Sequence, residues 1–70
     1  MFWWFERNGR FMRCETRHVR GDDYELVITG SDGSDRVERF ANSADLTRRQ
    51  EDLERDLLAD GWTGPHGWNV

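Results

Sequence analysis

Residues 1–14, MFWWFERNGRFMRC, decide the fold because they place four aromatic residues directly before a strong turn signal. Asn8-Gly9 is typical of a two-residue type I′ turn, whose central residues both need positive φ angles. Such a turn pairs the stretches before and after it as an antiparallel hairpin. A strand with one buried face needs apolar side chains only at alternate positions, so four aromatic residues in a row must supply both faces of a sheet.

The register set by this turn sorts the side chains between the two faces. It places Trp3 opposite Cys14 and Trp4 opposite Arg13, and opposed residues share a face. One face collects Trp3, Phe5, Met12, Cys14 and Thr16. The other collects Phe2, Trp4, Glu6, Phe11, Arg13, Glu15 and Arg17. The first set is nearly all apolar, and we expect it to form the core.

A third strand is predicted over residues 24–29, YELVIT, with its even-numbered Tyr, Leu and Ile side chains on the core face. To bring these beside the core face of the second strand, the loop around residues 20–23 must be odd in length, most simply three residues. Gly21 supplies the left-handed conformation that such loops often need.

A fourth strand is predicted after a second two-residue turn at Asp32-Gly33. The register of that turn brings Val37 onto the core face. It also turns Phe40 outward, unless a bulge near Arg39 reverses its direction.

The apolar spacing becomes helical after residue 42. Asn42 or Ser43 fits the N-cap, and Asn42 with Asp45 has the spacing of a capping-box variant. The leucines at 46, 53 and 57 form a narrow apolar stripe that is suited to lying on a sheet.

The helix is expected to stop before Gly61, which fits the left-handed C′ position, with Trp62 in the hydrophobic contact that follows. The predicted fold class is α+β: a four-stranded antiparallel β-meander with one C-terminal α-helix packed on one face (ββββα). Residues 1–62 form this single domain, and residues 63–70, which are rich in Gly and Pro, are expected to be a loosely ordered C-terminal tail.

Composition points to a small folded domain inside a cell. The one cysteine, Cys14, excludes an intrachain disulfide and fits a reducing cytoplasm. No apolar stretch approaches the ~20 residues of a membrane span, and the start lacks the basic lead of a signal peptide. We therefore expect a soluble, cytoplasmic chain. Its aromatic start and its Asp-Gly-Trp helix ending give the impression of a small bacterial protein.

Charge is unevenly distributed along this lysine-free chain of net charge −4. Residues 1–20 contain five Arg against two acidic residues, whereas residues 21–70 contain five Arg against twelve. A basic, aromatic N-terminal segment therefore precedes an acidic remainder of the chain.

Catalytic patterns are weak. Cys14 with His18 as its base would be the only nucleophile pair, but Cys14 falls on the core face and His18 lies ~13 Å along an extended strand. His66 has no evident partner. We expect no enzyme activity, no metal, no cofactor and no small-molecule substrate.

The sheet face opposite the helix is the candidate binding surface. Its predicted residues are Phe2, Trp4, Phe11, Arg13, Arg17, Val27 and Phe40. It fits a protein interface, either with another copy or with a different protein, because Trp, Phe and Arg are the types enriched there.

Two other interpretations remain open. The same aromatic and arginine side chains could stack unpaired bases of a single-stranded nucleic acid, although the acidic remainder of the chain weakens this case. Alternatively, the face is solvent-exposed and binds nothing, and its side chains only stabilise the sheet, with Trp4 over Arg13 as a cation–π contact and Arg/Glu pairs between strands. The favoured hypothesis is a non-enzymatic interaction module, with Trp4 as its anchor.

Overall fold

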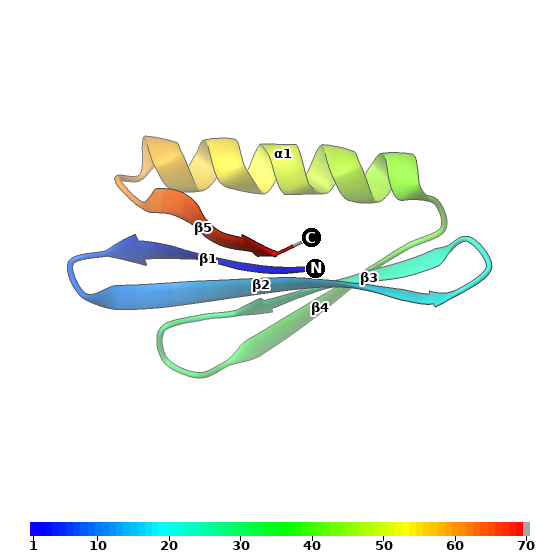
Figure 1. The fold of residues 1–70 in the computed structure, drawn as a ribbon, viewed down its shortest axis with the longest axis horizontal. Helices are drawn as coiled ribbons and strands as arrows, with labels where there is room; N and C mark the ends of the chain where they lie inside the picture. The colour runs from blue at the N-terminus through cyan, green and yellow to red at the C-terminus, as the bar shows by residue number, and fades with distance from the viewer. Residues whose placement is uncertain (70) are drawn as a thin grey trace.

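The computed structural model describes the backbone of residues 1–69 and the side chains of residues 1–67. These residues form an antiparallel sheet with one long helix lying along it (Figure 1). The elements are β1 (Phe2–Arg7), β2 (Arg10–Arg20), β3 (Asp23–Thr29), β4 (Asp35–Phe40), α1 (Ser43–Ala59) and β5 (Thr63–Asn69).

The strand order is β4-β3-β2-β1-β5 in a five-stranded sheet. The α+β class and the single helix are confirmed, but the prediction of four strands is wrong. The fifth strand is formed by residues 63–69, where we expected a loosely ordered tail. It returns from the helix to the far edge of the sheet and pairs antiparallel with β1, with irregular register.

The first hairpin confirms the register expected from Asn8-Gly9. Both turn residues have positive φ angles, 51° and 78°. Trp3 lies opposite Cys14, so the two faces are sorted as the turn signal predicted.

The β2–β3 connection keeps the predicted alignment of its strands by a different route. Cys14 lies opposite Ile28, as the expected odd loop required. The chain makes a two-residue turn at Gly21 and Asp22, and a register shift between His18 and Arg20 supplies the additional residue. A bulge next to a loop with an even number of residues therefore keeps the same β3 side chains on the core face as a loop with an odd number of residues would.

The β3–β4 register differs from the prediction by one residue. The connection spans residues 30–34 rather than Asp32-Gly33 alone, and the backbone N–H of Ser34 donates to the Asp32 carboxylate (3.0 Å). Val27 consequently lies opposite Val37, and Tyr24 lies opposite Phe40. Because side chains alternate along a strand, this shift exchanges the faces of β4.

The two ends of α1 are capped as predicted. The Asn42 side chain accepts a hydrogen bond from the backbone N–H of Asp45 (2.8 Å). At the other end Gly61 has φ 89°, and the N–H of Trp62 donates to the carbonyl of Leu57 (3.0 Å), which is the Schellman pattern.

The core lies between α1 and one face of the sheet. Its buried members are Trp3, Phe5, Cys14, Leu26, Leu46 and Leu57. Met12, Tyr24, Ile28, Phe40, Leu53 and Trp62 pack around them. Among the residues that the structure describes, no helix is long and apolar enough to cross a membrane.

Candidate interaction face

The face of the sheet that α1 leaves uncovered is called the outer face here. By register it carries Phe2, Trp4, Glu6, Phe11, Arg13, Glu15, Arg17, Glu25, Val27, Thr29, Asp35, Val37 and Arg39. Every predicted binding residue lies on it except Phe40. The structure adds Val37, which the wrong turn length had assigned to the core.

A shallow depression of about 220 Å³ occupies the middle of the outer face. Val27 is only 9% exposed there and lies among longer neighbours. The depression is lined by Phe2, Arg13, Cys14, Glu15, Arg17, Val27, Thr29 and Asp35. The fold therefore brings Phe2, Arg13, Arg17 and Val27 together around one depression with a mixed polar and apolar lining.

Exposed apolar side chains lie on several strands of the outer face. Phe11 is 51% exposed on β2, and Val37 is 52% exposed on β4. Phe2 is also exposed, on β1. Within the described residues α1 is the one helix, and it packs against the opposite side of the sheet (Figure 1).

Trp4 is held by β5 and is less available than the sequence suggested. A Cβ placed on Gly67 would lie 2.0 Å from the Trp4 ring, so the ring fills the space that a side chain at this position would need. The rings of His66 and Phe2 lie 6.0 and 6.1 Å from it, centroid to centroid. Trp4 thus fastens β5 to β1, and Phe2 and Phe11 are the more accessible aromatic groups.

The charges of the outer face are largely paired between or along strands. Arg17 lies 3.1 Å from Glu15, and Arg39 lies 3.2 Å from Glu25. Glu6 and Asp35 add further negative charge, and Asp35 accepts a hydrogen bond from the Thr29 hydroxyl (2.8 Å). The face has interleaved signs and lacks the positive field that attracts phosphate.

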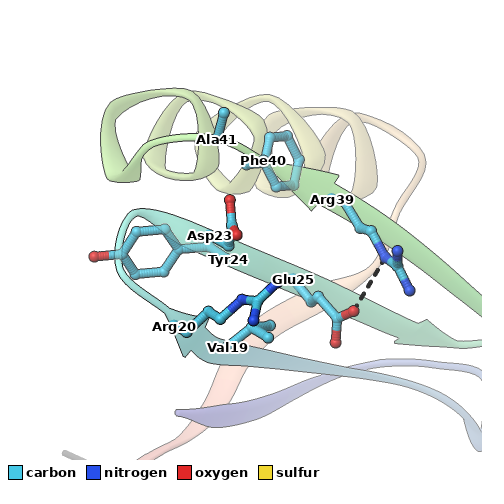
Figure 2. A pocket seen from close by; sticks show the side chains of 8 residues that line it. All are labelled: Val19, Arg20, Asp23, Tyr24, Glu25, Arg39, Phe40 and Ala41. Carbon is cyan, nitrogen blue, oxygen red and sulfur yellow. Dashed lines mark ion pairs between the residues drawn. The ribbon is translucent and has the colours of Figure 1, made fainter.

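Phe40 lies on the core side and does not join the outer face. In Figure 2 its ring lies beside the helix, while the side chain of Arg39 extends away to meet Glu25. Phe40 lines an open hollow of about 610 Å³ at the end of the β2–β3 hairpin. The other lining residues are Val19, Arg20, Asp23, Tyr24, Glu25, Arg39 and Ala41. The lining contains no Cys, His or Ser, so no nucleophile of these types faces it.

Cys14 and His18, the weak catalytic pair, have separate surroundings. Burial raises the pKa of the Cys14 thiol to about 12, which keeps it protonated at neutral pH. The His18 ring stacks on Tyr24, with 4.8 Å between centroids, and its Nε2 is hydrogen-bonded to the Gly21 carbonyl. Among the described side chains, no three His, Cys, Asp or Glu residues are grouped to hold a metal ion.

Comparison of the chain with protein-family models, with curated proteins and with solved structures found no match.

Proposed function

We propose that this chain is a non-enzymatic interaction module that binds a protein surface through its outer face. The observation that supports the proposal is the apolar content of that face: Phe2 and Val37 are exposed on either side of the nearly buried Val27, and Phe11 is exposed nearer the β1–β2 turn. Exposed Phe and Val side chains together with arginine match the residue types enriched at protein interfaces.

The charges favour a protein partner over a nucleic acid. Affinity for phosphate comes mainly from positive charge, yet Arg17 and Arg39 are each paired with a carboxylate. Single-stranded nucleic acid remains the alternative, with Phe2 and Phe11 as stacking platforms and the exposed Arg13 as the phosphate contact.

A second copy of the chain is the simplest protein partner. Interleaved arginines and carboxylates allow a rotated copy to meet opposite charges, as an isologous contact requires. The face measures roughly 500 Å² from strand spacing and length. This is smaller than the ~800 Å² that each partner contributes to a standard interface, so we expect a dissociation constant between ~10 μM and ~1 mM.

Phe11→Ser tests the proposal, because this side chain is half exposed on the outer face and lies outside the core cluster. Leu58→Ser is the matched control, since Leu58 is 46% exposed on α1, on the other side of the sheet. Sedimentation velocity of the wild-type chain from ~1 μM to ~1 mM should show association that Phe11→Ser weakens about tenfold, equivalent to ~1.4 kcal/mol.

Leu58→Ser should associate like the wild-type chain. A wild-type chain that stays monomeric at ~1 mM, or a Phe11→Ser variant that associates equally well, would contradict self-association through this face. Quenching of tryptophan fluorescence by an oligonucleotide at low salt, reversed at high salt and lost in Arg13→Ala, would instead support the nucleic-acid alternative.

A further inference from the structure

The strand β4 lies at an edge of the sheet: among the described residues, β3 pairs with it on one side and no strand pairs with it on the other. Figure 1 shows this edge on the far side of the sheet from β5, with no element drawn beyond it. An edge strand presents a row of backbone N–H and C=O groups to which another strand can pair.

The charges along β4 alternate in sign about a central valine. Residues 35–39 read Asp-Arg-Val-Glu-Arg, with Val37 in the middle. If a second β4 pairs antiparallel about Val37, then Asp35 lies opposite Arg39 of the other copy. Arg36 likewise lies opposite Glu38, and each contact occurs twice because the arrangement is two-fold symmetric.

Neighbouring registers lose this complementarity. A shift by two residues places Arg36 opposite Arg36, or Glu38 opposite Glu38. A shift by one residue places Arg36 opposite Arg39, or Asp35 opposite Glu38. Parallel pairing in register sets every charge against its own kind. Like charges directly opposite one another destabilise a strand pair, so the sequence selects the single register centred on Val37.

In this register the outer faces of the two copies also lie on the same side of the joined sheet. Asp35, Val37 and Arg39 lie on the outer face, whereas Arg36 and Glu38 lie on the side of α1. Each cross-strand pair therefore joins residues of the same face. Charges on an edge strand can simply discourage pairing, but that effect does not require their signs to be matched about a centre.

Three charged side chains of β4 already have partners within the chain, among them Arg39, which lies 3.2 Å from Glu25, and a second copy would add to these contacts. Glu38 accepts hydrogen bonds from Arg49 of α1 (2.7 and 3.1 Å), which fixes its carboxylate on the helix side. Asp35 is held by the Thr29 hydroxyl. Arg36 is exposed. In the pair it would contact Glu38 of the other copy, which is already bound by Arg49 of that copy, and so complete an Arg–Glu–Arg cluster.

We propose that two copies of this chain pair through β4, antiparallel and centred on Val37, to form one continuous sheet. The two-fold axis is then perpendicular to the sheet, so both outer faces lie on the same side. Their combined area, roughly 1,000 Å², exceeds the ~800 Å² that one partner contributes to a standard interface. This pairing stands independently of the outer-face function.

Val37→Cys tests the register directly. Opposed residues of an antiparallel pair have Cα atoms about 4.5 to 5.5 Å apart, within the range that a disulfide spans. Under mild oxidation this variant should form a disulfide-linked dimer within minutes, at least tenfold faster than Val19→Cys. Val19 is a matched control because it is equally exposed, at 53%, but lies on β2. Cys14 is buried and does not compete.

Equal crosslinking rates of the two cysteine variants would overturn the proposal. A second measurement uses Arg36→Glu, which sets two carboxylates opposite each other and should slow crosslinking of Val37→Cys at least tenfold. Arg48→Glu makes the same change of charge at an exposed site on α1 and should leave the rate unchanged. Equal effects of the two substitutions would also contradict pairing through β4.

The same assay separates this pairing from the proposed outer-face function. Phe11→Ser should leave the crosslinking of Val37→Cys intact, because Phe11 is on β2 rather than at the β4 edge. Loss of crosslinking in Phe11→Ser, with no effect of Arg36→Glu, would assign the contact to the outer faces and overturn the edge pairing.

Discussion

At the scale of single residues, Trp4 and Gly67 explain why the chain needs aromatic side chains on both faces of β1. The Trp4 ring lies where a side chain at position 67 would be, and Phe5 lies similarly close to Gly64 on the core side. A Cβ on Gly64 would approach the Phe5 ring to 2.8 Å. The aromatic residues of β1 therefore hold β5 from both sides, and the glycines of β5 make room for them.

Gly67→Ala is expected to destabilise the chain strongly. The new methyl group meets the Trp4 ring, and the backbone has φ 72°, which L side chains rarely adopt. We expect a loss of about 3 kcal/mol, of which about 1 to 2 is backbone strain. Chemical denaturation monitored by tryptophan fluorescence measures this loss in the free energy of unfolding.

Gly9→Ala is the matched control for this substitution. Its φ is 78°, yet nothing lies within 4 Å of the added Cβ. It should lose only the strain component, about 1 to 2 kcal/mol. Equal losses in the two variants would show that the Trp4 ring does not constrain position 67.

At the scale of secondary-structure elements, the placement of β4 depends on a single residue of loop length. The expected two-residue turn would have put Val37 under the helix. The actual connection, with Asp32 bound to Ser34, shifts the register by one and turns Phe40 inward instead. Glu38 then reaches Arg49 on α1, which joins the sheet to the helix by an ion pair.

Glu38→Gln should make stability less sensitive to acid. The hydrogen bond from Arg49 lowers the pKa of the Glu38 carboxyl in the folded chain. Its stabilisation is therefore present above the unfolded pKa and is lost as pH falls through the lower folded value. Between pH 5 and pH 3 the wild-type chain should lose about 1 kcal/mol more stability than Glu38→Gln.

Urea denaturation at several pH values measures this difference. Glu51→Gln, at an exposed position of α1, should keep the wild-type pH dependence. If Glu38→Gln and the wild-type chain lose the same stability over this range, the ion pair does not couple α1 to β4.

The sequence predicted those elements whose signals are local. Asn8-Gly9 set the first register, and the caps at Asn42 and Gly61 bounded the helix. Asp32-Gly33 was misleading because the conformation there is set by bonds from Ser34 to Asp32, which the dipeptide does not reveal.

The strand β5 was missed for a related reason. Gly, Pro and Asn make up four of its seven residues and have low strand propensity. The strand forms because β1 has an unpaired edge and aromatic side chains that pack against β5. The spacing of Gly64 and Gly67 was a signal, but it has meaning only once Phe5 and Trp4 are known to lie opposite.

On the scale of the whole molecule, α1 covers one side of the sheet, and the other side carries apolar side chains among its charges. A chain of 70 residues buries only ~60% of the surface that it exposes when unfolded, so its own core gives a thin margin of stability. Six of the seven side chains predicted for binding share the outer face, and Phe40 alone does not. Association through that face would bury the apolar groups that the helix leaves uncovered.

Methyl NMR at increasing protein concentration tests the use of the outer face most directly. The Val27 methyl groups lie at its centre, whereas the exposed Leu58 methyl groups lie on α1 and report on unrelated contacts. Between ~20 μM and ~1 mM, the Val27 signals should shift progressively while those of Leu58 stay fixed, and Phe11→Ser should require about tenfold higher concentration for the same shift. Fixed Val27 signals, or shifts confined to Leu58, would contradict self-association through the outer face.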